Sequence, residues 1–169
     1  DNCPNDELRD TFKLPSYINK MVENNWLGSK TNGGFYKKEK DENGKSTILS
    51  LDLSTLEYSP VKKVSFETVG KARKISKVLD RFPQLIEGKD KAGEFYRFNF
   101  GTMFSYVQNR IPEISDELYR VDDALRAGFG WKNGPFEIWN SIGLKKGIEL
   151  IEELGHKPSK WILEMVMKL

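Results

Sequence analysis

Residues 121–137 are VDDALRAGFGWKNGPFE, a stretch that decides the fold because glycine and proline punctuate a helical sequence there. Gly128 and Gly130 can end a helix, since glycine adopts positive φ at no steric cost and lets the chain reverse. Pro135, after Gly134, suits the first turn of a following helix, where no N–H donor is required. We therefore predict a corner between two helices. Three aromatic side chains should wedge into it: Phe129, Trp131 and Phe136.

These glycines are not expected to bind a nucleotide. The spacing Gly128-x-Gly130-x-x-x-Gly134 differs from the dinucleotide fingerprint, and it follows a helical pattern rather than a strand. The neighbouring Asp122 and Asp123 point about 100° apart on a helix, which excludes a catalytic carboxylate pair. Negative charge is favoured near a helix N-terminus, so we expect the aspartates to lie there. The stretch is predicted to be a structural corner and not a catalytic loop.

Helical periodicity continues over most of the chain. We predict a helix over residues 4–25, one beginning at Ser65 and running to Leu79, and a short turn of helix that starts at Pro83. Basic residues on the helix after Ser65 should form a solvated face. A long helix should begin at Asp90 and be kinked or broken at Pro112, which lacks an N–H donor. Further helices are predicted over residues 135–142, 144–154 and 158–168.

The exception to the helical pattern is one predicted hairpin. Asn43-Gly44 separates residues 35–40 from residues 46–53, where apolar and polar residues alternate from Leu49 onward. Asn-Gly between two such runs is the strongest short-range hairpin signal. Residues 55–63 should be an extended connection. The fold class is therefore mainly α with one small β-hairpin.

Composition excludes several classes of protein. Twenty-seven basic and 25 acidic residues leave a formal charge of +2, with no basic excess to indicate a nucleic acid partner. The single cysteine, Cys3, cannot form an internal disulfide. No apolar run approaches the roughly 18 to 20 residues that span a bilayer. We expect a cytoplasmic protein.

A complete active site is missing from the sequence. The single histidine, His156, lies in a polar stretch between two predicted helices and is expected to be an exposed loop residue. No Cys/His set has metal-ligand spacing, and no phosphate-binding loop is present. We therefore predict no catalytic, metal-binding or cofactor-binding residue in this chain.

An internal repeat links the two ends of the chain. Residues 17–22 and 161–166 share the pattern aromatic-Ile-x-x-Met-Val, and a Pro-Ser pair precedes each copy. The chain begins near the end of one repeat and ends inside the next. We expect it to be part of a larger protein.

Two stretches resemble a known family. Residues 121–137 with Ile142-Gly143 are similar to the C-terminal domain of 3-hydroxyacyl-CoA dehydrogenases, which has Asp-x-Ala, a Gly-Phe-Gly turn and Gly-Pro-Phe before an acidic residue. Residues 26–36, WLGSKTNGGFY, resemble the closing segment of the same domain. That resemblance implies a helical domain like the C-terminal one of 6-phosphogluconate dehydrogenase, present in tandem in some β-oxidation enzymes. Residues 1–40 would end a first copy, 41–89 would hold the hairpin and a connecting helix, and 90–169 would form most of a second copy.

The resemblance also implies a function. Family members oxidise L-3-hydroxyacyl-CoA with NAD, using a histidine and a glutamate of a preceding Rossmann domain that this chain lacks. The helical part would close over the substrate and support a homodimer, and it would be inactive alone. Asn109, followed by Arg110, matches the family's substrate-contacting Asn-Arg dipeptide, which makes Asn109 the one candidate substrate-binding residue. Asn140 stands where family members have Asp.

Two other functions stay open at this point. The chain could be a free-standing interaction module, in which exposed aromatics such as Trp139 and Trp161 bind a protein partner. It could also be a helical module that binds an acyl-CoA in a cleft between its helices. In both alternatives the chain belongs to a protein that binds a partner or ligand and is not an enzyme.

Overall fold

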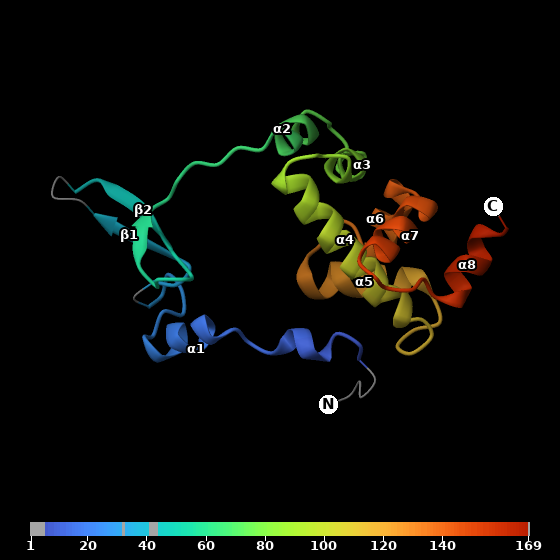
Figure 1. The fold of residues 1–169 in the computed structure, drawn as a ribbon, viewed down its shortest axis with the longest axis horizontal. Helices are drawn as coiled ribbons and strands as arrows, with labels where there is room; N and C mark the ends of the chain where they lie inside the picture. Colours follow the sequence, from blue (N-terminus) through green and yellow to red (C-terminus); the bar gives the residue numbers. More distant parts are fainter. Residues whose placement is uncertain (1–5, 32, 41–43, 169) are drawn as a thin grey trace. The chain divides into compact units, whose positions relative to one another are not determined.

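The computed structural model describes residues 6–31, 33–40 and 44–168. These residues form two compact units, residues 1–64 and 65–169 (Figure 1). The structure is mainly helical with a small antiparallel sheet, which confirms the predicted fold class. The predicted repeat boundaries at residues 40 and 89 concern correspondence to a family domain and stay a prediction. Cys3 and the Asn43 of the hairpin turn lie outside the described residues.

The first unit begins with two short helical segments where one helix was predicted. A 3₁₀ helix, Arg9–Phe12, is followed by α1, Ser16–Glu23, with Pro15 at its N-cap position. The prediction of one helix over residues 4–25 was therefore wrong. Proline disfavours the helical conformation of the residue before it, so Leu14 and Pro15 separate the two segments.

The sheet of the first unit has three strands in the order β1-β2-β3. The predicted hairpin is confirmed as β1, Tyr36–Lys40, paired with β2, Ser46–Leu51. The predicted extended connection instead contributes a third strand, β3, Tyr58–Pro60, which is antiparallel to β2. The side chain of Asp52 accepts hydrogen bonds from the backbone N–H groups of residues 54 and 55, at 2.8 and 3.1 Å, and so forms the turn that returns the chain.

The second unit begins with two short helices, α2, Glu67–Arg73, and α3, Arg81–Ile86. The helix predicted from Ser65 to Leu79 is therefore shorter, its N-cap position is Phe66, and α3 begins before Pro83. Beyond α2, the guanidinium Nε of Arg81 donates to the carbonyl of Ile75 at 2.7 Å, which satisfies a carbonyl in the connecting turn. The basic residues are exposed as predicted, but the last two lie beyond the end of α2 and do not share a helix face with the others: Lys71, Arg73, Lys74 and Lys77.

The long helix α4, Lys91–Asn109, begins after Asp90 as predicted and ends shortly before Pro112. The side chain of Asp90 accepts from the N–H of Gly93 at 3.1 Å, which caps α4, and from the N–H of Thr68 at 3.1 Å, which ties the start of α2 to it. Pro112 lies beyond the end of the helix, which confirms the predicted break. The remaining helices are α5, Leu118–Phe129; α6, Pro135–Ile142; α7, Leu144–Glu153; and α8, Lys160–Val166.

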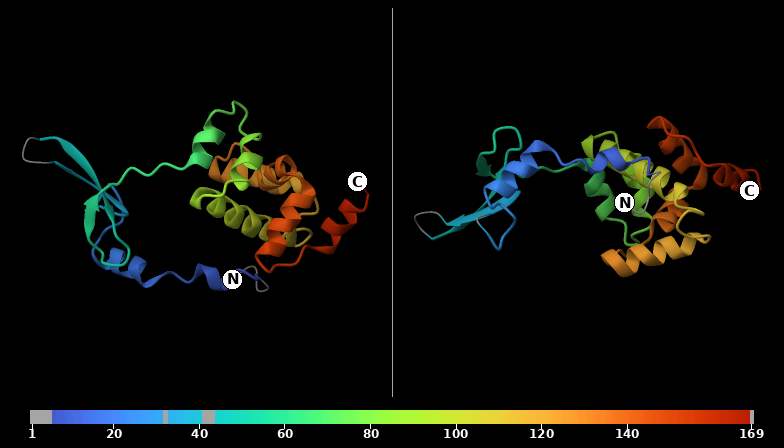
Figure 2. Two further views of the ribbon diagram at one scale, coloured as in Figure 1. Left: turned by 45° about the horizontal axis from the view of Figure 1, so that its top comes forward. Right: turned by 90° about the horizontal axis from the view of Figure 1, so that it is seen from below.

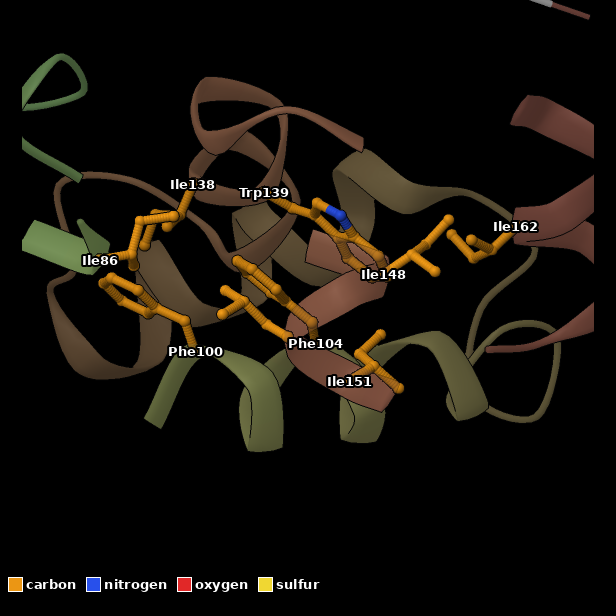
Figure 3. Packing of buried hydrophobic residues seen from close by; sticks show 9 residues of the cluster. Ile86, Phe100, Phe104, Ile138, Trp139, Ile148, Ile151 and Ile162 are labelled. Carbon is orange, nitrogen blue, oxygen red and sulfur yellow. The ribbon is translucent and has the colours of Figure 1, made fainter. Parts of the chain in front are cut away.

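The core of the second unit forms around α4, with α3, α6 and α7 packed against it in every view (Figure 1 and Figure 2). Phe104 of α4 is 0% exposed, and its ring stacks on Trp139 of α6 with centroids 4.7 Å apart. Figure 3 shows Ile86 and Phe100 at one end of this cluster and Ile162 of α8 at the other. Stacked aromatic rings stabilise a core beyond the area they bury.

Within the described ranges, no helix is both long and apolar enough to cross a bilayer.

Candidate functional site: the α5–α6 corner and its cavity

The corner between α5 and α6 exists where the glycines predicted it. Gly130 caps α5 with φ of +67°, a left-handed conformation that favours glycine. Gly128, in contrast, lies inside α5 and has no positive φ, so its predicted role at the turn was wrong. Pro135 is the first residue of α6, as predicted. The corner is therefore made by one left-handed glycine and one N-terminal proline.

Asp122 holds the two helices of the corner together. This residue is 4% exposed, and its carboxylate accepts from the N–H of Phe136 at 2.8 Å and of Glu137 at 3.2 Å, in the first turn of α6. Asp123 turns away and pairs with Arg126 at 2.6 Å. For Asp122 the prediction of a place near a helix N-terminus is confirmed, although the helix is the next one along the chain.

A close approach at Gly134 makes this capping contact possible. A Cβ added there would lie 2.2 Å from the Cβ of Asp122, which is too close for two carbon atoms that are not bonded to each other. The side chain of Glu137 accepts from the N–H of Gly134 at 2.8 Å, and its carboxylate also pairs with Arg126. The backbone N–H groups of residues 134, 136 and 137 at the start of α6 have no partner within the helix, and each donates to a carboxylate. Pro135, between them, has no N–H group.

The two carboxylates differ in their electrostatics. Burial raises the pKa of Asp122, and the hydrogen bonds from the two amides offset this only in part. The amide of Gly134 and the guanidinium of Arg126 lower the pKa of Glu137. Both shifts follow from structural contacts, so neither residue needs a catalytic role to explain its pKa.

Only one of the three predicted aromatic wedges is present. Phe136 packs against the core, with ring centroids 6.3 Å from Trp139 and 6.2 Å from Trp161. Phe129 and Trp131 are 76% and 40% exposed, and that part of the prediction was wrong. They lie at the end of α5 and in the turn, beyond the helix positions that face the core.

A cavity of about 420 Å³ opens beside the corner, between α5, α6 and α8. Asp122, Glu137 and Asn140 give it a polar side. Its remaining lining is apolar or aromatic: Leu118, Tyr119, Phe136, Trp139, Leu144, Trp161, Ile162 and Met165. A mainly apolar cavity with a few polar groups is typical of sites for small molecules.

The candidate substrate-binding residue, Asn109, lies away from this cavity. It is the exposed last residue of α4 and is not part of the cavity lining. Arg110, which follows it, is buried, with its guanidinium 4.5 Å from the ring of Tyr106 and 3.2 Å from the carboxylate of Glu113. Asn109 therefore lies at the surface, whereas Arg110 packs inside the second unit.

Sequence reasoning missed Gln108, which is 0% exposed. Its side-chain amide donates to the carbonyl of Lys157 at 3.0 Å and accepts from the N–H of Ser159 at 2.8 Å, while its backbone carbonyl accepts from the indole of Trp161 at 3.1 Å. These contacts anchor the start of α8 to the end of α4. The available signal was its position four residues after Phe104, on the core face of α4.

His156 lies between α7 and α8, as predicted, but it is half-buried rather than exposed. Its backbone N–H donates to the carbonyl of Ile151 at 3.2 Å, which draws the loop against the end of α7. Trp139, offered as an exposed aromatic for a protein partner, is 2% exposed, and Trp161 is half-buried. These two side chains belong to the fold and do not form a free aromatic surface.

Comparison with known proteins confirms the resemblance seen in the sequence. The chain is 38% identical over 168 residues to a probable 3-hydroxyacyl-CoA dehydrogenase of Bacillus subtilis, over 99% of this chain and 20% of that protein. It is 27% identical over 146 and 165 residues to putative fatty acid oxidation complex trifunctional enzymes of Rickettsia prowazekii and Rickettsia felis. Those alignments cover 86% and 90% of this chain, and 18% and 21% of the relatives.

The chain thus spans about a fifth of the length of the curated relatives that it matches. No family profile matches it, and no solved structure matches it.

Proposed function

We propose that this chain is the helical, substrate-closing and dimerising part of an NAD-dependent L-3-hydroxyacyl-CoA dehydrogenase of fatty-acid β-oxidation, and that it is inactive alone. The observation that carries the proposal is the 38% identity to a probable 3-hydroxyacyl-CoA dehydrogenase over 99% of the chain. The α5–α6 corner supports it, because the residues of the resemblance are also the residues that build this corner. We place the full-length enzyme in the cytoplasm.

The described residues do not fit NAD. The sheet is antiparallel and lies within residues 36–60, whereas a dinucleotide site requires a glycine loop between a parallel strand and a helix. The glycines of the corner lie within or after the helix α5 and not after a strand, and the space at Gly134 is taken by the Asp122 side chain. We therefore assign NAD and the proton transfer to the rest of the full-length enzyme, and substrate closure and dimerisation to this chain.

The proposal is tested by measuring NADH formation from L-3-hydroxyacyl-CoA. The full-length protein should form NADH, and the 169-residue chain alone should not. No NADH from the full-length protein with short, medium or long acyl chains would overturn the dehydrogenase assignment. NADH formation by the chain alone would overturn its inactivity. Sedimentation of the full-length protein as a monomer would overturn the dimer.

Asn109 is our candidate for the contact with substrate. In the full-length enzyme, Asn109→Ala should raise KM for the hydroxyacyl-CoA about fivefold, the effect of one lost hydrogen bond. Asn99→Ala is the matched control, because Asn99 is an exposed asparagine of the same helix whose side chain bonds the carbonyl of Phe95. An unchanged KM for Asn109→Ala would remove the residue from the site.

A second candidate function is binding of an acyl chain without catalysis, favoured by the apolar cavity beside the corner. Trp139 and Trp161 line that cavity, so their fluorescence should change as long-chain acyl-CoA is added. Met165→Lys, which places a charge in the lining, should abolish the change. Exposed Met167→Lys, two residues further along the chain, is the control. No fluorescence change with the unaltered chain would eliminate this candidate.

A further inference from the structure

We propose that the turn between α2 and α3 binds a phosphate group, with Arg73, Lys74 and Lys77 as its cations. The inference goes beyond the proposed function and does not depend on it. Every charged residue from 71 to 79 is basic, whereas the whole chain has a formal charge of only +2. The turn therefore has a local excess of positive charge that the chain as a whole lacks.

The three cations are available to a ligand. Arg73, Lys74 and Lys77 are all exposed, and none of them forms an ion pair with another described residue. Lys71, the basic residue before them, is instead paired with Glu67 at 2.7 Å. An anion at the turn would therefore not have to displace a carboxylate of the protein from any of the three.

The dipole of α2 explains part of this charge. A helix C-terminus favours basic side chains in its last turn. Arg73 is the last residue of α2, and Lys74 occupies its C-cap position. Lys77 lies beyond the C-cap, where the effect of the dipole has fallen off. A charged helix end therefore does not account for the whole cluster.

Arg81 gives the turn a fixed shape. Its Nε donates to the carbonyl of Ile75 at 2.7 Å, and its Nη2 donates to the carbonyl of Ser76 at 3.3 Å, so both carbonyls are directed towards one guanidinium. In a planar trans peptide, the N–H is directed opposite to the C=O. Both peptide bonds are trans, so the N–H groups of Ser76 and Lys77 are directed away from Arg81.

These two N–H groups complete the site. Within the described part of the chain, neither has an acceptor, and Ser76 also offers an exposed hydroxyl. Successive backbone N–H groups in a turn form a site for anions. A phosphate group has several strong acceptor oxygens, which can take hydrogen bonds from the backbone and pair with ammonium and guanidinium groups at the same time.

Phosphate groups occur both in soluble ligands and in phospholipid headgroups, and the turn offers the same contacts to each. For a soluble ligand, the test is titration of the isotope-labelled 169-residue chain with inorganic phosphate, followed by nuclear magnetic resonance. The amide signals of Ser76 and Lys77 should shift with phosphate and not with sodium chloride of equal ionic strength. Higher ionic strength should weaken the binding, because exposed ionic contacts are screened by salt.

For a lipid, the test is co-sedimentation of the chain with vesicles of phosphatidylglycerol and, separately, of phosphatidylcholine, whose headgroup also carries a cation. Binding to the first alone would assign the phosphate to an anionic lipid. Amide shifts with inorganic phosphate but no vesicle binding would assign it to a soluble ligand. Equal binding to both kinds of vesicle would overturn the lipid assignment, and no response in either test would overturn the site.

Variants locate the binding. Lys77→Gln and Arg73→Gln should each weaken it about threefold through loss of one exposed charge contact. Lys145→Gln is the matched control, because Lys145 of α7 is an exposed lysine that forms no ion pair with the other described residues. Equal affinities for Lys77→Gln and Lys145→Gln would overturn the site.

Arg81→Lys separates the shape of the turn from its charge. The change keeps the positive charge, but an ammonium lacks the planar fork that holds two carbonyls. Phosphate binding should weaken about threefold, because the two N–H groups are no longer held in place for the ligand. Unchanged binding would overturn the role of the N–H groups. If thermal melts show Arg81→Lys unfolded, the comparison of Lys77→Gln with Lys145→Gln still decides whether the site exists.

Discussion

Gly134→Ala should destabilise the second unit, because the side chain of Asp122 occupies the space that the new methyl group would need. The backbone at Gly134 has φ of −79°, a value that any residue adopts, so the cost comes mainly from steric overlap and not from backbone strain. The new Cβ would lie 2.2 Å from the Cβ and 2.3 Å from the Cγ of Asp122. Neither atom is the free end of a flexible chain, because both lie next to the backbone of α5.

The magnitude follows from the displacement that this overlap requires. Carbon atoms approach no closer than about 3.5 Å without repulsion, so α5 and α6 must separate by about 1 Å at the corner. The hydrogen bonds of Asp122 to the N–H groups of Phe136 and Glu137, now 2.8 and 3.2 Å long, would then be too long to persist. Overpacking and the two lost bonds together should cost about 2–4 kcal/mol.

The assay is urea unfolding of the chain, followed by circular dichroism and by tryptophan fluorescence, since three of the four tryptophans lie in the second unit. The control is Gly128→Ala, because a Cβ at Gly128 of α5 meets nothing within 4 Å. Alanine in a helix interior should stabilise by roughly 0.5–1 kcal/mol there. Gly134→Ala with wild-type stability, or with a gain like that of Gly128→Ala, would refute the close packing of the corner.

Four further changes test other contacts. Asp122→Ala should lower the free energy of unfolding by about 2–3 kcal/mol, because it leaves two N–H groups of α6 without their acceptor. The control Asp123→Ala, at an exposed residue, should lower it by less than about 0.5 kcal/mol. Equal losses in urea unfolding would contradict this. The folded state lowers the pKa of Glu137 from its ordinary 4.5, so the contribution of its carboxylate to stability is present above pH 4.5 and is lost as pH falls through the folded pKa. Glu137→Gln should therefore weaken the fall of the melting temperature at acid pH. An unchanged dependence of the melting temperature on pH would count against the ion pair and the cap. The folded state raises the pKa of Asp122 from its ordinary 3.8, so ionisation of this carboxyl costs stability as pH rises through the folded pKa, and Asp122→Asn should remove that loss from the same melts. Gln108→Leu should lower the free energy of local opening of α8 by about 2–3 kcal/mol, because two buried hydrogen bonds are lost. The expected result is faster amide exchange in residues 159–166. Unchanged exchange would show that Ile162 and its neighbours hold α8 without Gln108.

Local signals in the sequence predicted much of the second unit. Asp90 caps α4, Pro112 lies past its end, and Pro135 starts α6, because each residue acts through backbone chemistry within one helical turn. The predicted hairpin strands also formed, since alternation and a turn residue need only neighbouring chain. The same reasoning failed at Pro15, where we allowed a helix to pass through a residue that interrupts it.

Contacts between distant residues could not be predicted in this way. Asp122 reaches across fourteen residues to cap α6, Gln108 reaches across about fifty to hold α8, and neither pairing has a mark in its local sequence. Phe129 and Trp131 looked like core residues because large aromatics usually are, yet the direction of the turn leaves them in solvent.

Helix positions, the hairpin and the family resemblance thus follow from the order of residues, because propensity, periodicity and capping operate over a few positions. Which face of each helix is buried, which polar side chain bridges two helices and where a cavity opens depend on how the helices pack. Packing is set by many weak contacts between residues far apart in the chain, and those contacts exist only once the tertiary structure has formed.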